Sequence, residues 1–134
     1  MSKIALIVVG VLIAGALVFA WPFGRDALSS AKQKRALQTR SDYPQITTAC
    51  VTLAHTMDRE DTLIRPADPR VPALLRSLSP RYISASTNYV RLEFHGGFEH
   101  YGYRVEQSAT DSRQWTISYY TEQGRKPLTT ISHD

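Results

Sequence analysis

An uninterrupted apolar run opens the chain, and shorter periodic patterns follow it. Residues 4–20 contain no polar or charged side chain. Extending the run to Phe23 gives about 20 residues, or about 30 Å of helix, which matches the hydrocarbon core of a bilayer. Trp21, Phe23 and Arg25 stand where interfacial anchors are expected. The run exceeds the usual apolar core of a signal peptide, so we predict that residues 1–24 are a retained single-pass transmembrane helix; a cleaved signal is the alternative.

Charges and small residues around this segment bear on its topology and packing. Lys3 is the one basic side chain before the run, whereas Arg25 and four further basic side chains lie between residues 25 and 40. The positive-inside rule therefore favours a cytoplasmic C-terminal domain, with the exported side as the alternative. Gly10 and Ala14 have the small-xxx-small spacing that permits close helix packing in a homo-oligomer or with another membrane protein. Small residues are also common in membrane helices that do not associate.

Residues 25–41 contain good helix formers and neither glycine nor proline. Their apolar positions do not form one clean stripe, so we predict a basic juxtamembrane stalk that is partly helical. Its basic side chains could rest on anionic headgroups of the bilayer. A solvated linker that only carries the topology charges is the alternative.

Two amphipathic helices are predicted after the stalk. Asp42 is a candidate N-cap for the first helix, whose apolar stripe at helical spacing consists of Ile46, Ala49, Cys50, Leu53 and Met57. Because Cys50 lies in the middle of that stripe, we expect a buried thiol with a raised pKa rather than a nucleophile. The charged, proline-containing segment 59–70 is predicted to be a loop. A short second helix follows over Val71, Leu74, Leu75 and Leu78, and Ser79-Pro80 ends it.

From Arg81 onward the apolar residues recur with a period of two. The alternation predicts strands over residues 82–85, 90–95, 101–106 and 115–120, and a weaker strand over 128–131. The pattern indicates an α+β domain at residues 42–134, with two helices packed on an antiparallel meander sheet of four to five strands. Consecutive hairpins without βαβ units exclude a dinucleotide-binding fold.

Charge and cysteine content narrow the function classes. Residues 1–43 hold six basic and two acidic side chains, a net +4, whereas residues 44–134 hold ten of each and are neutral. A nucleic-acid-binding domain should carry a basic face of its own, so we do not expect nucleic acid as a partner. A single cysteine excludes an internal disulfide framework and a cysteine-based metal cluster.

The stretch EFHGGFEHYGY, residues 93–103, concentrates the residue types that most resemble a chemical site. With Gly96-Gly97 at the tip of a primed turn, it predicts a hairpin in which the numbers of paired residues sum to 193. Leu92 then pairs with Tyr101 on the core side. On the other face Glu93 lies across from His100, His95 from Phe98 and Tyr89 from Arg104. The stretch is explained as a hairpin without any ligand.

A functional interpretation of the same residues stays open beside the hairpin. Glu93, His95 and His100 share a face, and two imidazoles with a carboxylate are the ligand types of a zinc or iron site or an acid/base pair. The spacing of the histidines is not an established metal motif, and a sheet surface is not a pocket. We therefore predict no metal and no cofactor, and name no catalytic residue.

Aromatic and basic residues of the predicted sheet form a second candidate surface. Exposed aromatic side chains beside arginine are typical of protein interfaces, and the candidate partner-binding residues are Tyr89, Arg91, Phe98, Arg104 and Tyr120. The combined prediction is a non-enzymatic accessory or interaction protein anchored in the bilayer, a subunit or assembly factor of a membrane complex. The alternatives are a metal-binding or acid/base enzyme domain that uses Glu93, His95 and His100, and a ligand-sensing module on the aromatic sheet face.

Overall fold

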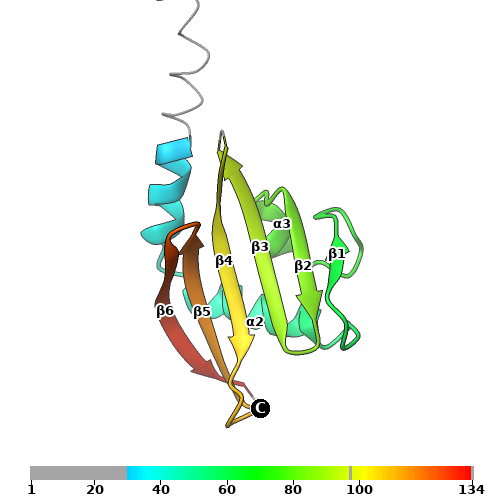
Figure 1. The fold of residues 1–134 in the computed structure, drawn as a ribbon. Coiled ribbons are helices and arrows are strands. Elements are labelled where there is room, and N and C mark those ends of the chain that lie inside the picture. Colours follow the sequence, from blue (N-terminus) through cyan, green and yellow to red (C-terminus); the bar gives the residue numbers. More distant parts are fainter. Residues whose placement is uncertain (1–29, 97, 134) are drawn as a thin grey trace, which may run out of the picture.

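The structure is a computed structural model that describes residues 30–96 and 98–133 (Figure 1). The predicted anchor lies outside the described residues. So do the helix-packing residues Gly10 and Ala14 and the interface residues Trp21, Phe23 and Arg25. Among the helices of the described ranges, none has the length and apolar character needed to cross a bilayer.

Within the described ranges, a helical segment at residues 30–38 comes first and is followed by two helices and six strands. The helices are α2 (Tyr43–Ala54) and α3 (Ala73–Ser77), and the strands are β1 (Thr62–Ile64), β2 (Tyr82–Ser86), β3 (Tyr89–Gly96), β4 (Glu99–Gln107), β5 (Gln114–Thr121) and β6 (Gly124–Ser132). All strands belong to one antiparallel sheet in the order β1-β2-β3-β4-β5-β6. The predicted α+β class and the meander order are confirmed, but the sheet has six strands rather than four or five.

The additional strand is β1, which lies inside the segment that the sequence assigns to a loop. Thr62, Leu63 and Ile64 pair antiparallel with β2. The loop prediction was wrong for these residues because the charges before them and the prolines after them outweigh a run of only three strand-forming residues. Ile64 is buried, and Leu63 on the opposite face is 67% exposed.

The helix α2 forms where its apolar stripe predicts it, except that it ends at Ala54, before Met57 of that stripe, and it covers one face of the sheet. In Figure 1 it crosses behind the strands, and it contacts β2, β3, β5 and β6. Its residues Ile46, Cys50 and Leu53 are fully buried. Asp42 is the N-cap residue, but its side chain makes no capping hydrogen bond. Burial raises the pKa of the Cys50 thiol, as the sequence predicts.

The helix α3 is a single short turn held by apolar contacts. Leu75 is fully buried, and Val71 and Leu78 on either side of the helix also join the core. Ser79 adopts a positive φ of 56° directly after the C-cap, and Pro80 follows. A left-handed residue before proline cannot continue the helix, so α3 ends where the sequence predicts.

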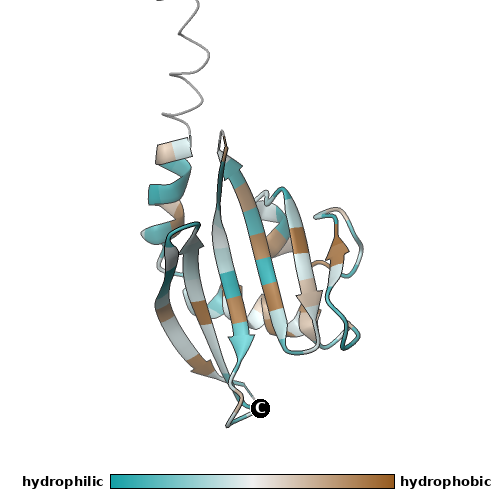
Figure 2. Cartoon of the chain, viewed as in Figure 1, coloured by the Kyte–Doolittle hydropathy of each residue, from teal (hydrophilic) through white to brown (hydrophobic). Residues whose placement is uncertain are grey.

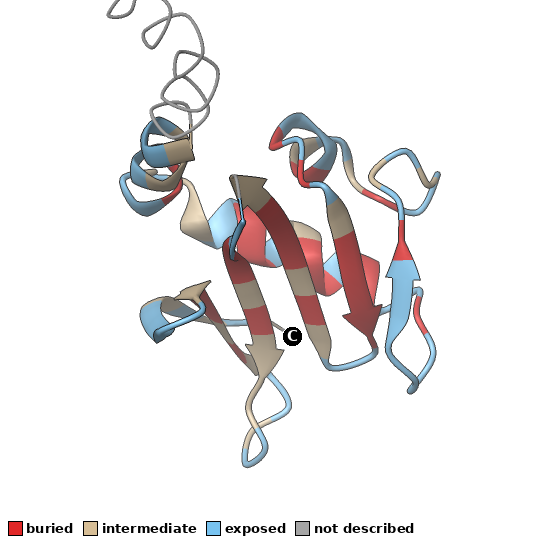
Figure 3. Cartoon of the chain, turned by 45° about the horizontal axis from the view of Figure 1, so that its top comes forward, coloured by how far each residue is buried: buried red, intermediate tan, exposed pale blue. Residues whose placement is uncertain are grey.

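Alternating side chains give the sheet one apolar face and one polar face. Along β3 and β5 buried residues alternate with less buried ones over much of each strand (Figure 3). Along β3 the hydropathy alternates in the same way (Figure 2). The face toward α2 holds the largest buried side chains, among them Phe94, Tyr101, Tyr103 and Trp115. The opposite face, which we call the open face, is not crossed by any helix or strand of the described part of the chain (Figure 1).

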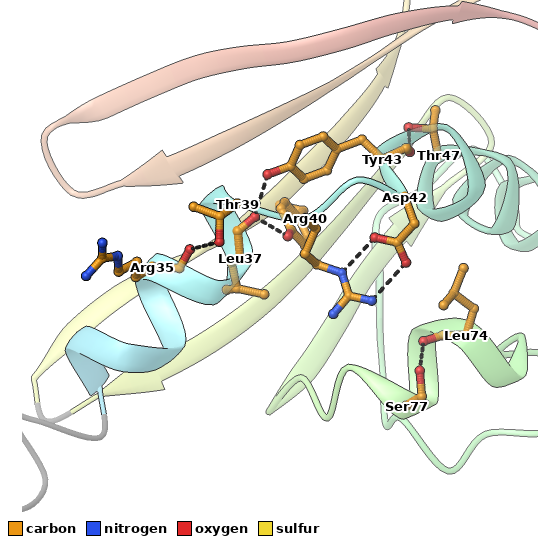
Figure 4. Close-up of polar contacts among 10 residues, drawn as sticks. Arg35, Leu37, Thr39, Arg40, Asp42, Tyr43, Thr47, Leu74 and Ser77 are labelled. Atoms are coloured by element: carbon orange, nitrogen blue, oxygen red, sulfur yellow. Dashed lines mark hydrogen bonds and ion pairs between the residues drawn. The ribbon is translucent and has the colours of Figure 1, made fainter.

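The helical segment 30–38 packs on the core side of β4. The Tyr101 hydroxyl donates to Gln33 Oε1, and the Tyr103 hydroxyl donates to the main-chain carbonyl of Leu37. Leu37 is 4% exposed and belongs to the core. The same carbonyl accepts a hydrogen bond of 2.9 Å from the Tyr43 hydroxyl (Figure 4). These buried contacts hold the segment against the sheet.

An arginine–aspartate pair fixes the turn between this segment and α2. Arg40 Nε and Nη2 donate to the two carboxylate oxygens of Asp42, each at 2.8 Å (Figure 4). The hydrogen bonds from Arg40 lower the pKa of Asp42. The bidentate geometry restricts both side chains and the chain direction where segment 30–38 meets α2.

The register of the β3–β4 hairpin differs from the predicted one by two residues. Phe94 pairs with Tyr101, His95 with His100 and Gly96 with Glu99, so the numbers sum to 195 rather than 193. A shift of two leaves every side chain on its face, so the face pattern alone could not reveal it. The predicted register would have placed Glu99 opposite Phe94 on the core side. The observed one stacks Phe94 on Tyr101, with ring centroids 6.2 Å apart.

Candidate functional site

The candidate site lies on the open face, at the end of the sheet where the β3–β4 hairpin turns. Tyr82 of β2, Glu93 of β3, Gly102 of β4 and Tyr120 of β5 pair successively across four strands and form one row. His95 and His100 form the next row toward the hairpin end. A buried carboxylate at the centre of these groups sets the chemistry of the site.

Glu93 is buried although no helix of the described residues covers its face of the sheet (Figure 1). Its side chain is 4% exposed. Removing a carboxylate from water costs several kcal/mol unless hydrogen bonds and opposite charges replace the lost hydration. Its neighbours therefore have to supply donors to both of its oxygens.

One oxygen of Glu93 faces the two histidines. His100 Nδ1 lies 2.9 Å from Oε1, and His95 Nε2 lies 3.5 Å from the same oxygen. The two imidazole rings are nearly perpendicular, with centroids 4.3 Å apart. Tyr82 packs edge-on against the His95 ring at 5.7 Å and restricts its orientation. His95 and His100 therefore both direct a nitrogen toward Oε1.

The other oxygen accepts a hydrogen bond from a tyrosine and lies near an arginine. The Tyr120 hydroxyl donates to Oε2 of Glu93, and Arg91 Nε lies 3.5 Å from that oxygen. Burial is the main cause that raises the pKa of Tyr120, and the hydrogen bond to Glu93 raises it further. The Tyr120 hydroxyl therefore keeps the proton that it donates. These contacts fix the plane of the carboxylate and leave Oε1 to the histidines.

Gly102 makes this geometry possible. It stands between Glu93 and Tyr120 in the row of paired residues, and because it has no side chain, Tyr120 can reach across β4 to Oε2. A Cβ atom at this position would lie 1.9 Å from the main-chain oxygen of Leu92. The sequence predicts a shallow gap at Gly102, and the structure fills that gap with the Tyr120 side chain.

A second group of charges lies farther along the open face. Glu106 accepts hydrogen bonds from Arg104 and, at 2.9 Å, from Arg125. The Arg104 guanidinium also lies 5.0 Å from the centroid of the Tyr89 ring. Tyr89 and Arg104 are not directly opposite as predicted, because Tyr89 pairs with Glu106. Their contact is diagonal across β3 and β4.

Arg59 and Asp61, from the loop before β1, join these residues around an open depression of about 550 Å³. Tyr89, Arg91, Arg104 and Glu106 also line it. The arginines outnumber the carboxylates there, so the depression favours acidic groups.

The structure brings together most of the residues singled out from the sequence. Glu93, His95 and His100 are in mutual contact, and the partner candidates Tyr89, Arg91, Arg104 and Tyr120 share the open face. Phe98 is fully exposed at the end of the hairpin. Sequence reasoning did not place three further residues on this face. The position of Tyr82 depends on the strand register, that of Leu63 on β1 and that of Arg125 on β6.

Comparison with known proteins found no relative of this chain. No model of a known protein family matches the chain, and neither a curated protein nor a solved structure matches it. The functional argument therefore depends on the geometry of the open face.

Proposed function

We propose that this chain is a non-enzymatic interaction protein, anchored in a membrane by its N-terminal apolar segment. In this proposal, the open face binds another protein of the same membrane that presents carboxylate side chains. The single observation that carries the proposal is that the open face, left uncovered by the described elements, concentrates tyrosine and arginine side chains.

The composition of this face supports a protein partner. Arginine and tyrosine are enriched at the centres of protein interfaces because they combine large contact area with hydrogen bonding. Leu63 adds an apolar side chain that is 67% exposed, in register with Ser84 and Arg91. The arginine-rich depression favours an acidic segment of the partner over a basic one.

Membrane anchoring would strengthen such an interaction without additional contacts. Two proteins held in one bilayer meet at a raised effective concentration, so a modest interface is sufficient. The segment 30–38 is fixed against the core by Leu37, Tyr101 and Tyr103. The proposal places this domain on the cytoplasmic side, as the basic residues after the apolar run favour.

Photo-crosslinking in intact membranes tests this function. A photoreactive amino acid replaces Tyr89 on the open face or, as the matched control, Arg113 in the exposed β4–β5 connection. The expected result is one specific crosslinked membrane protein from position 89 and none from position 113. Mass spectrometry should place the crosslink in an acidic segment of that protein.

A pair of charge reversals completes the test. Arg59→Glu should abolish copurification of the crosslinked protein from gently solubilised membranes, whereas Arg113→Glu, an equal charge change elsewhere, should preserve it. Circular dichroism checks that both variants remain folded. Crosslinks to a second copy of this chain alone, or equal copurification with both variants, would contradict the proposal.

A further inference from the structure

We propose that Glu93, His95 and His100 form a binding site for a divalent transition-metal ion of the Zn²⁺ type. The proposal does not require partner binding, because its three ligands lie at the hairpin end of the open face and none of them lines the arginine-rich depression. Two imidazole nitrogens and one carboxylate oxygen are a donor set that zinc accepts in proteins.

The spacing of the donor atoms fits a metal ion. One ligand atom from each residue can be chosen so that all three lie within 4.8 Å of one another. The two distances from Glu93 Oε1 are 2.9 Å to His100 Nδ1 and 3.5 Å to His95 Nε2. Zinc bonds of about 2.0–2.2 Å in tetrahedral geometry separate the ligand atoms by about 3.3–3.6 Å. Small side-chain rotations would bring the three atoms to that spacing.

The surroundings of Glu93 orient it as a ligand with a single free oxygen. Tyr120 and Arg91 occupy the side of Oε2, so Oε1 remains directed at the imidazoles. Hydrogen bonds to the other atoms of a ligand typically orient it and tune its affinity for the metal. Arg91 is the neighbouring charge that opposes a cation, and its Nε lies beside Oε2 rather than Oε1.

His95 supplies an independent observation. Its Nε2 atom is buried and has no hydrogen-bond partner among the residues that the structure describes. Buried polar atoms without a partner are uncommon in folded proteins and indicate an unrecorded ligand or a functional role. A metal ion bound between His95 Nε2, His100 Nδ1 and Glu93 Oε1 would satisfy this atom.

The site would keep a coordination position open. Beside the cluster is a shallow depression of about 250 Å³, lined by Tyr82, Arg91, Glu93, His100, Tyr120 and Glu122, among others. Three protein ligands and an open fourth position distinguish sites that bind water or an external ligand from closed structural sites. We therefore infer a three-ligand site whose fourth position is taken by water.

Zinc titration of the full-length protein in detergent, after removal of metals with a chelator, tests the site. The chain contains four histidines, two in the proposed site and two, His55 and His133, that pack together elsewhere with ring centroids 6.0 Å apart. The matched control is therefore His55→Ala/His133→Ala, which leaves the proposed ligands as the only imidazoles.

The expected result is saturable binding of one Zn²⁺ per chain with micromolar or tighter affinity in the wild type and in His55→Ala/His133→Ala. His100→Ala should weaken binding by at least about tenfold. Replacing a residue that only orients a metal ligand typically weakens metal binding about 10–100-fold, and loss of a ligand itself should have a larger effect. Because the His100 side chain is half exposed, this variant should remain folded. Cobalt(II) should give the intense visible absorption of a tetrahedral site, and His95→Ala should lose it.

Two outcomes would overturn the proposal. One is the absence of saturable binding at micromolar zinc in a folded wild-type sample. The other is binding that persists in His95→Ala/His100→Ala and disappears in His55→Ala/His133→Ala, which would move the metal to the other histidine pair.

Discussion

Replacing Tyr103 with phenylalanine removes one of two hydroxyls that donate to the main-chain carbonyl of Leu37. Tyr103 and Tyr43 both donate to this oxygen, and Leu37 itself is buried. Either single replacement leaves the carbonyl with one donor, so each should cost only the net value of a hydrogen bond, about 0.5–1.5 kcal/mol. The double replacement leaves a buried carbonyl without either donor, which adds a desolvation cost of about 1–3 kcal/mol.

The effects of Tyr43→Phe and Tyr103→Phe on the free energy of unfolding should therefore not add. The double variant should exceed the sum of the single variants by about 1 kcal/mol or more, whereas independent sites add within about 0.3–0.5 kcal/mol. The assay is urea unfolding of the full-length protein in a mild detergent, followed by far-ultraviolet circular dichroism. Additive effects would refute the shared-acceptor argument and would mean that water replaces the lost donors at Leu37.

Three further predictions concern the core, the hairpin and the turn before α2. Cys50 should resist alkylation in the folded protein and react after urea unfolding, because the thiol is buried and its pKa is raised; mass spectrometry reports the adduct. Gly102→Ala should lower the free energy of unfolding by about 2 kcal/mol or more, since the new Cβ would collide with the oxygen of Leu92; urea titration measures the loss. Asp42→Asn should cost about 1 kcal/mol or less at pH 7, because the Arg40–Asp42 pair is partly exposed. Folding lowers the pKa of Asp42. The contribution of Asp42 to the free energy of unfolding is therefore present above its unfolded pKa of about 3.9 and disappears as pH falls through its folded pKa. The difference between Asp42→Asn and wild type in urea titrations should shrink correspondingly below about pH 4.

The candidate site was only partly visible in the sequence. The alternation around Glu93, His95 and His100 correctly indicates that they share a face, because side-chain direction in a strand depends only on parity. The burial of the Glu93 side chain could not be predicted in the same way. It depends on Tyr120, which lies two strands away and reaches Glu93 only because Gly102 stands between them.

Local patterns by themselves determined most of the secondary structure. The stripe through Ile46, Cys50 and Leu53 predicts α2, and the period-two pattern predicts which side chains of β3, β4 and β5 enter the core. These features are set by residues within one or two turns or along one strand. A single sequence therefore contains all the information that specifies them.

Contacts between distant segments decided the remainder. The two-residue shift in the β3–β4 hairpin is invisible to the face pattern, and it is favoured by the stacking of Phe94 on Tyr101. The strand β1 exists because β2 offers it an edge to pair with, since three residues cannot form a stable strand alone. Segment 30–38 packs on the sheet because Gln33 and the carbonyl of Leu37 meet hydroxyls from β4, more than 60 residues later in the chain. Such long-range pairings depend on which surfaces meet after folding, so only the tertiary structure could specify them.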